Sequence, residues 1–144
     1  MAAELRGSME RIRAMSAEIV ALRERVRDAQ MERLRVRLRE LLEGADLSEG
    51  RLLTEAALLV ERSDIDEENV RLLTHAERFV AMLEEGGEVG KRMDFLLQEL
   101  NREANTMLSK TGGAVGEHGL RITELGLAVK TEIERAREQV QNLE

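Results

Sequence analysis

The feature that most constrains this chain is a helical spacing of apolar residues that no proline interrupts. The sequence contains no Pro, Trp or Tyr and only two Phe, while 42% of its residues are hydrophobic. Pro is the main breaker of helices, and aromatic and β-branched residues favour sheets, so this composition is typical of helices. Apolar residues recur at intervals of three and four, as an α-helix with one buried face requires. We therefore expect an all-α fold without strands.

The clearest apolar face lies in the segment from Gly90 to Lys110. A rotation of 100° per residue places six apolar residues in one stripe: Val89, Met93, Leu97, Leu100, Ala104 and Met107. One border of this stripe carries Asp94, Gln98, Asn101 and Asn105, and the other carries Glu99, Glu103, Thr106 and Lys110. Asn is a poor helix former, so two Asn residues in one line indicate a hydrogen-bonding role. An ordinary solvated face is the alternative.

Long, narrow apolar faces mark both ends of the chain. The first runs from about Ala3 to Leu42, and the last, from Leu120 to Glu144, is less than about 90° wide. Such faces are typical of coiled coils and of the long helices of bundles. We predict an elongated bundle of about five helices, in which the coiled-coil-like first and last helices are longest and pack nearly antiparallel to their neighbours.

Two shorter helices are expected between the first helix and the central one. Gly44 is placed to end the first helix, and a second helix, capped from Asp46-Leu47-Ser48, should end near Arg62. Asp66 is a candidate cap for a third helix from Glu67 to about Leu83. The length fits one domain, residues 1–144, with a long helical arm at 1–43 and a further helical region at 44–144.

A histidine in the third helix shares a face with acidic residues. His75 follows Glu68 by seven residues, which is almost two whole turns, so both lie beside the buried stripe. A single His near a helix face is more often structural or solvated. The neighbouring carboxylates of Asp64, Glu67 and Glu68 favour instead a general acid–base or metal-binding role. The sequence leaves both interpretations open.

The net charge of −7 argues against a protein that simply coats nucleic acid, because such proteins are usually basic. It does not exclude a nuclease, since carboxylates can hold a divalent cation while local Arg and Lys residues bind RNA. The most basic stretch holds seven arginines between Arg23 and Arg39, which are either solvated or in contact with the RNA backbone. With no Cys, no signal peptide and no apolar run long enough to span a membrane, we expect a cytoplasmic protein without membrane contact.

Three blocks of the sequence resemble one known family. The blocks GKRMDFLLQELNREANTMLSK (90–110) and REQVQNLE (137–144) closely resemble the C-terminal part of the YicC-like endoribonucleases. A third block, ERSDIDEENVRLLTHAERF (61–79), resembles the acidic and histidine segment of that family. The likeness extends from about Leu41 to Glu144, and family members also carry an N-terminal half that this sequence does not contain. The resemblance implies a metal-dependent endoribonuclease cleaving single-stranded or structured RNA, hexameric and ring-like when intact.

The resemblance implies the activity, and chemistry suggests individual roles. Carboxylates suit Mn²⁺ or Mg²⁺, which polarises a phosphoryl oxygen and activates water, while Arg and Lys neutralise developing charge. The expected catalytic residues are Asp64, Glu68, His75 and Glu103. The expected metal ligands are Glu67, Glu99, Glu134 and Glu144. The expected contacts to RNA or phosphate are Gln98, Asn101, Arg102, Asn105, Lys110 and Arg137.

A non-catalytic helical module for oligomerisation or interaction is the alternative. In that case the polar borders only specify register and form structural ion pairs. Composition and periodicity alone favour this interpretation, and whether the chain is active without an N-terminal half stays open. Narrow apolar faces at both ends predict exposed apolar surface and homo-oligomerisation. If the central and last helices face each other, their polar borders would bring Glu99, Glu103, Glu134 and Arg137 within reach of each other, either as structural ion pairs or as part of a site. An active site further predicts that Asp64, Glu68 and His75 lie on the same side of the bundle, close to Glu99, Arg102, Glu103 and Arg137.

Overall fold

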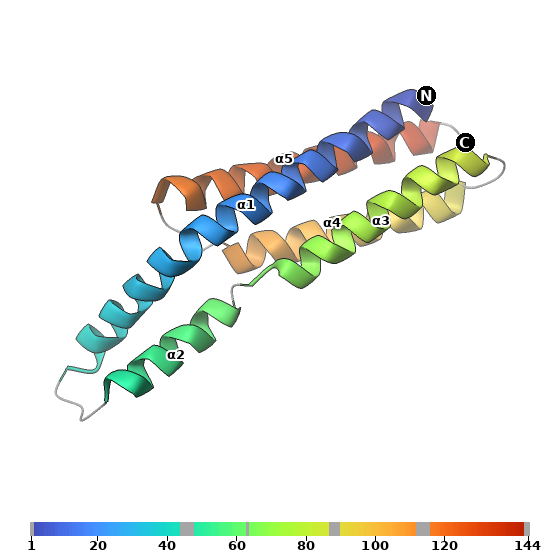
Figure 1. The fold of residues 1–144 in the computed structure, drawn as a ribbon. Coiled ribbons are helices and arrows are strands. Elements are labelled where there is room, and N and C mark those ends of the chain that lie inside the picture. Colours follow the sequence, from blue (N-terminus) through green and yellow to red (C-terminus); the bar gives the residue numbers. More distant parts are fainter. Residues whose placement is uncertain (1, 44–47, 63, 87–89, 112–115, 143–144) are drawn as a thin grey trace.

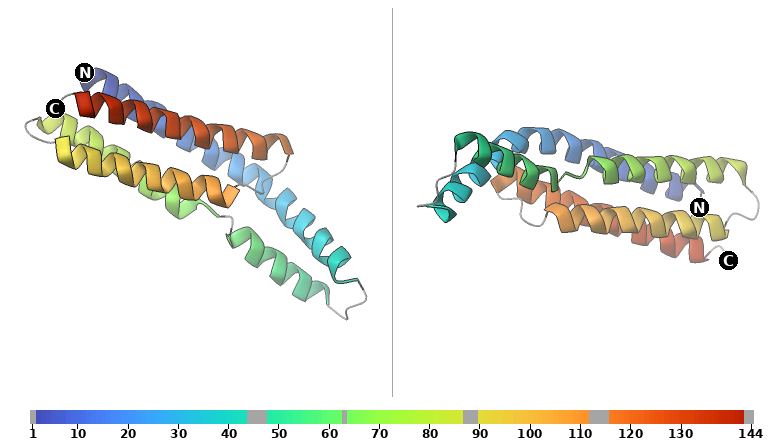
Figure 2. Two further views of the ribbon diagram at one scale, coloured as in Figure 1. Left: turned by 180° about the vertical axis from the view of Figure 1, so that it is seen from behind. Right: turned by 90° about the horizontal axis from the view of Figure 1, so that it is seen from below.

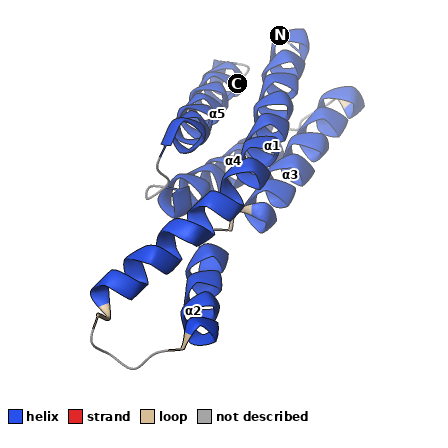
Figure 3. Cartoon of the chain, turned by 60° about the vertical axis from the view of Figure 1, so that its left-hand side comes forward, coloured by secondary structure: helices blue, strands red, loops and turns tan. Residues whose placement is uncertain are grey.

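The structure is a computed structural model that describes residues 2–43, 48–62, 64–86, 90–111 and 116–142. These residues form five helices and no strand, which confirms the expected all-α class (Figures 1 and 3). The helices are α1 (Ala2–Leu41), α2 (Glu49–Arg62), α3 (Asp66–Glu85), α4 (Gly90–Thr111) and α5 (Gly116–Asn142). Several residues named above lie outside the described ranges: Gly44, Asp46, Leu47, Val89 and Glu144.

Four helices form an elongated bundle, and α2 extends it at one end. Two layers, α1 with α5 and α3 with α4, face each other, and contacts between α1 and α3 and between α4 and α5 close the bundle (Figures 1 and 2). Helix α2 packs against the second half of α1, beyond the point where α3 begins (Figure 1). The predicted arm spans residues 1–43, and the first half of its helix lies within the bundle. The predicted division into domains stays a prediction.

The expected apolar stripes meet in a core shared by α1, α3, α4 and α5. Five members of the central stripe are buried: Met93, Leu97, Leu100, Ala104 and Met107. The faces of the two end helices are buried as well, through Leu5, Met9, Ile12, Ile19 and Leu22 of α1 and Ile122, Leu125, Val129, Ile133, Ala136 and Val140 of α5. Since a buried large apolar side chain contributes about 1.5–3 kcal/mol, these faces supply the main drive for folding.

Polar contacts fix how α1 lies against its neighbours. The buried Ser16 hydroxyl donates to the amide oxygen of Asn69 in α3, and the Asn69 amide donates to the Ser16 carbonyl at 3.4 Å. Gln139 of α5 donates to Glu4 at 2.8 Å, so α1 and α5 run antiparallel and the described ends of the chain lie together (Figure 2). Leaving a buried polar group unpaired costs about 1–3 kcal/mol, so the Ser16–Asn69 pair opposes sliding of α1 along α3.

The start of α3 differs from the expectation. Asp66 is the first helical residue rather than the cap, and its N–H donates to the carboxylate of Asp64 at 2.9 Å. This difference has a local cause, because an Asp side chain readily accepts a hydrogen bond from the backbone N–H two residues later. Asp64 therefore organises the entry into α3.

Apolar side chains remain exposed where α1 and α2 extend beyond the bundle. Helix α2 buries Leu52 and Ala56, whereas Val36, Leu41, Leu42, Leu53 and Leu58 expose between 38% and 71% of their surface. The expected exposed apolar surface is thus present. In the described ranges, no helix is both long enough and apolar enough to cross a membrane.

Candidate active site

Charged side chains gather where α3 faces α4. Glu68 and Glu103 are buried, with only 3% and 6% of their surfaces exposed. The guanidinium of Arg71 donates through Nε to Glu103 at 2.9 Å, and its Nη2 lies 3.6 Å from Glu68. The ammonium of Lys110 donates to Glu68 at 2.6 Å. We call Glu68, Arg71, Glu103 and Lys110 the α3–α4 charge cluster.

Helical periodicity builds this cluster from local sequence. Glu68 and Arg71 lie about one turn apart on α3, and Glu103 and Lys110 lie about two turns apart on α4. Because the two helices run antiparallel, Glu68 is opposite Lys110 while Arg71 is opposite Glu103. Each acidic residue of one helix therefore meets a cation of the other.

Burial of the two carboxylates makes the cations necessary. Removing a charged group from water costs several kcal/mol unless opposite charges and hydrogen bonds compensate. The hydrogen bond from Arg71 to Glu103 raises the pKa of Arg71 above its ordinary value, so the guanidinium remains charged. The second oxygen of Glu68, Oε2, is buried and has no hydrogen-bond partner among the described residues. Glu68 therefore depends on contacts to a single oxygen.

The two cations reach the surface while their carboxylate partners do not. The side chain of Arg71 is 48% exposed and that of Lys110 is 33% exposed. Besides Glu68, Lys110 donates to the backbone carbonyl of Asp64 at 3.2 Å. An ammonium group has three N–H donors, so one is left for an acceptor outside the described part of the chain. The cluster thus presents two oriented cations to solvent.

His75 lies on the same flank of α3, about one turn beyond Arg71. Its side chain is half-buried, and its Nδ1 atom is buried without a hydrogen-bond partner in the described ranges. Glu68 and His75 share a helical face, as their spacing of seven residues predicts. The imidazole therefore lies about one helical turn from Arg71, and its Nδ1 has no hydrogen-bond partner among the described residues.

The other border of the central stripe faces α5 instead of α3. Gln98 donates to Asp94 at 3.0 Å, and Arg137 of α5 lies 3.7 Å from Asp94. Asn101 is half-buried with an unpartnered amide oxygen, and Asn105 is exposed. The core stripe separates this border from the α3–α4 charge cluster. Arg137 is consequently paired at another interface than Glu103.

The expected metal ligands are dispersed. Glu67 is 86% exposed beside Arg71, Glu99 lies 3.8 Å from the exposed Arg102 on its own helix, and Glu134 is exposed. No group of three or more His, Asp or Glu residues that could hold a metal ion occurs in the described part of the chain. Because Arg71 and Lys110 already engage Glu103 and Glu68, the described donors do not fit a three-ligand centre. Metal dependence stays a prediction.

Two arginines that received no individual role in the sequence analysis lie at the site. Arg71 holds Glu103, and Nη2 of Arg27 in α1 lies 3.5 Å from the carboxylate of Asp64. Arg71 lies on the helix face between Glu68 and His75, so its spacing could have identified it as a site residue from the sequence. Arg27 belongs to an arginine-rich run, and nothing in the local pattern distinguishes it from its neighbours.

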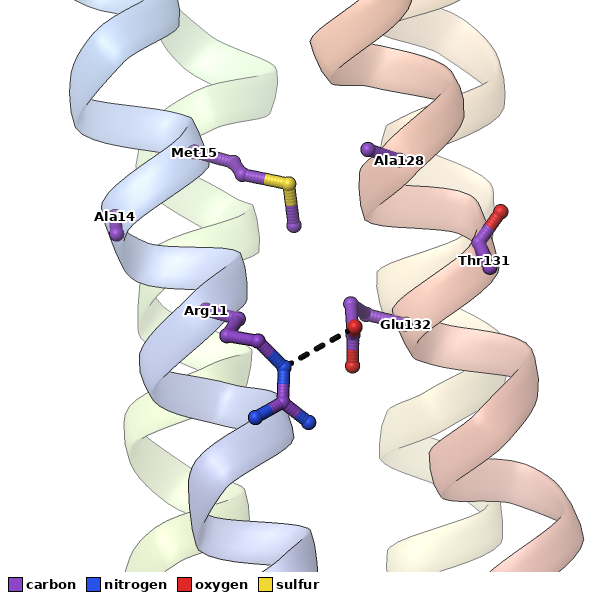
Figure 4. A pocket seen from close by; sticks show the side chains of 6 residues that line it. All are labelled: Arg11, Ala14, Met15, Ala128, Thr131 and Glu132. Carbon is purple, nitrogen blue, oxygen red and sulfur yellow. Dashed lines mark ion pairs between the residues drawn. The ribbon is translucent and has the colours of Figure 1, made fainter.

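A shallow depression between α1 and α5 is separate from this cluster. It has a volume of about 390 Å³ and is lined by Arg11, Ala14, Met15, Ala128, Thr131 and Glu132 (Figure 4). Arg11 lies 3.1 Å from Glu132 across the depression (Figure 4). It contains none of the candidate site residues.

Comparison with known families identifies the family to which the chain belongs. Residues 19–144 match the family described as endoribonuclease YicC-like, C-terminal. This chain belongs to that family. The match confirms the resemblance and begins earlier than Leu41, where the sequence blocks placed its start.

Two curated YicC relatives show how much of such a protein the chain represents. The probable endoribonuclease YicC of Clostridioides difficile is 35% identical over 141 residues, which cover 97% of this chain and 44% of that protein. The probable endoribonuclease YicC of Haemophilus influenzae is 42% identical over 112 residues, covering 76% of this chain and 37% of that protein. The YicC-like chain thus spans less than half the length of these relatives.

The α3–α4 charge cluster joins two of the three blocks that resemble YicC. Glu68, Arg71 and His75 come from the block at 61–79, and Glu103 and Lys110 come from the block at 90–110. Residues far apart in the sequence therefore converge on one flank of the bundle. The third block contributes Arg137 to the interface between α4 and α5 instead.

Proposed function

We propose that this YicC-like chain takes part in endonucleolytic cleavage of RNA, with the α3–α4 charge cluster as its active site. The observation that carries the proposal is the pair of buried carboxylates that orient two surface cations beside a histidine. The names of the YicC relatives, as probable endoribonucleases, support RNA as the substrate class.

In this proposal Arg71 and Lys110 bind phosphate oxygens. Hydrogen bonds between ionised groups are roughly twice as strong as neutral ones, and oriented cations stabilise the charge that develops on a phosphoryl group. Glu68 and Glu103 hold the cations in place and do not contact RNA. The site therefore presents positive charge on a chain whose overall charge is −7.

His75 is the proposed group for proton transfer. An imidazole is the side chain best suited to accept and donate protons near neutral pH. Nδ1 of His75 is buried and has no partner among the described residues, so contact with a ribose hydroxyl or with water would come through the other ring nitrogen, Nε2, of this half-buried side chain. A bound Mn²⁺ or Mg²⁺ would supply further stabilisation of phosphate charge. The described carboxylates do not fit a three-ligand ion site, so the proposed RNA contacts rest on Arg71, Lys110 and His75.

Cleavage and binding of a labelled RNA by purified variants test the proposal. Lys110→Gln should weaken RNA binding about tenfold, as the loss of a charge-assisted contact worth about 1.5 kcal/mol predicts. His75→Ala should abolish cleavage while RNA binding and helicity stay unchanged. The exposed Lys91, on the same helix and without an ion pair to a described residue, supplies the control Lys91→Gln. Assays with Mn²⁺, Mg²⁺ and EDTA decide the metal requirement.

A non-catalytic role is the second candidate, and the exposed apolar residues of α1 and α2 favour it. Val36, Leu41, Leu53 and Leu58 offer a surface for a second copy of the chain. Absence of both RNA cleavage and RNA binding in the unsubstituted chain would leave this oligomerisation role standing alone, whereas full cleavage by His75→Ala with unchanged binding by Lys110→Gln would place the active site elsewhere in the chain. The hexamer implied by the resemblance, and the cytoplasmic location, stay predictions.

A further inference from the structure

Asp64 connects three helices immediately before α3 begins. One carboxylate oxygen accepts the N–H of Asp66 at 2.9 Å, and the other lies 3.5 Å from Nη2 of Arg27 in α1. Its backbone carbonyl accepts a hydrogen bond from Lys110 of α4 at 3.2 Å. All three of its oxygens are therefore used.

The surroundings of Asp64 on α1 are strongly positive. Arg27 lies next to its carboxylate, and the buried Arg23 is close enough for its charge to interact with both Asp64 and Asp66. Burial lowers the pKa of Arg23, and the charges of these two carboxylates oppose that effect. Helix α1 thus holds Asp64 electrostatically in the position from which its carbonyl reaches Lys110.

Lys110 needs this second acceptor to be oriented. A lysine side chain carries about 2 kcal/mol of rotamer entropy, which a single contact at Glu68 opposes only in part. Two acceptors, Oε1 of Glu68 and the carbonyl of Asp64, direct two N–H groups inward. The third N–H then points away from both. If the backbone carbonyl of Asp64 moved out of reach, the ammonium would be free to turn about its contact with Glu68.

We propose that Arg27 and Asp64 are positioning residues of the proposed active site, because they hold the Lys110 ammonium ready for an RNA phosphate. This inference rests on the proposed function. It makes α1 part of the site, although the residues that touch RNA lie on α3 and α4. It also gives Asp64, a candidate catalytic residue in the sequence analysis, a role exerted through Lys110.

Chemical labelling of lysines tests the positioning without RNA. The chain has three lysines, Lys91, Lys110 and Lys130, so acylation by a limiting reagent can be measured for each by mass spectrometry. In Arg27→Gln and Asp64→Ala, labelling of Lys110 relative to Lys91 should rise about tenfold, the change expected when one hydrogen bond to a charged group is lost. Arg27→Lys, which keeps the charge beside Asp64, should restore most of the protection.

The exposed Arg25 supplies the matched control, since it lies on the same helix and makes no ion pair with a described residue. Arg25→Gln should leave the labelling of all three lysines unchanged. Because Arg27 is 52% exposed and Asp64 is 31% exposed, circular dichroism should show full helicity in each variant. Unchanged labelling of Lys110 in folded Arg27→Gln and Asp64→Ala would overturn the positioning role.

RNA kinetics separate this inference from the proposed function. Arg27→Gln should raise KM for RNA about threefold to tenfold and also lower kcat, because Lys110 is proposed both to bind the phosphate and to stabilise the charge that develops on it. Increased labelling without any change in KM would contradict the RNA role of Lys110 and thus the proposed function. Unchanged labelling with a Lys110→Gln variant that loses RNA binding would contradict only the positioning role.

Discussion

The buried carboxylate of Glu68 predicts an asymmetry between two substitutions at one ion pair. Glu68 has 4% of its side chain exposed, while its partner Lys110 has 33% exposed. Lys110→Met leaves a buried carboxylate without its closest cation, and breaking a buried pair in this way costs about 3–5 kcal/mol. Arg71 remains 3.6 Å from Glu68, so we expect the lower end of that range, about 3 kcal/mol.

Glu68→Gln should cost much less. The variant loses two contacts to charged groups, but it also removes the need to bury a charge, and Lys110 and Arg71 can turn toward water. We therefore expect a loss of about 1 kcal/mol. Replacement of both partners, as Glu68→Leu with Lys110→Met, should be more stable than Lys110→Met alone, because no buried charge is left unpaired.

Urea unfolding followed by circular dichroism measures these differences as free energies of unfolding. All variants should be compared at one pH and one protein concentration, since self-association would stabilise the folded state. Lys91→Met, a substitution of an exposed lysine on the same helix, should change the free energy of unfolding by less than about 0.5 kcal/mol. A loss for Lys110→Met no greater than that for Glu68→Gln would refute the dependence of Glu68 on Lys110.

Three further outcomes follow from the fold. Asn69→Ala should lower the free energy of unfolding in urea by about 1–3 kcal/mol, because it removes a buried pair between α1 and α3. Burial raises the pKa of Asp66 above its ordinary value of 3.8, and the charge of the neighbouring Asp64 raises it further. The folded protein therefore binds more protons than the unfolded chain, and its stability should fall as pH rises from about 3.8 through the raised pKa. Asp66→Asn should remove that fall in a pH series of thermal unfolding. Leu41→Lys with Leu53→Lys should shift sedimentation toward monomer if these exposed residues join two copies.

The core could be predicted from sequence because its signal is local. Burial of Met93, Leu97, Leu100, Ala104 and Met107 follows from one helical period within one segment. Helix ends were less predictable: α5 begins at Gly116 rather than Leu120, and Asp66 is the first residue of α3 rather than its cap. Single-residue contacts, rather than periodicity, decide these boundaries.

The candidate site was only partly predictable, for a geometric reason. The shared face of Glu68 and His75 depends on spacing within one helix, and the structure shows it. Which neighbour each border of α4 would face depends on packing, so the sequence could not place Glu103 against α3 and Arg137 beside Asp94. Pairing of Arg27 with Asp64 across the bundle had no local signal at all.

The two borders of α4 allow the most direct test of the active-site assignment. Glu103→Gln alters the border that faces α3, and Asp94→Asn alters the border that faces α5, where Asp94 lies 3.7 Å from Arg137. Each substitution removes one negative charge from α4. In Glu103→Gln the lost charge is paired with Arg71 of α3, and in Asp94→Asn it is paired with Arg137 of α5. The decisive measurement is the rate of RNA cleavage by the two purified, fully helical variants. The account predicts loss of cleavage in Glu103→Gln and near-normal cleavage in Asp94→Asn, whereas normal cleavage by Glu103→Gln with loss in Asp94→Asn would place the site between α4 and α5.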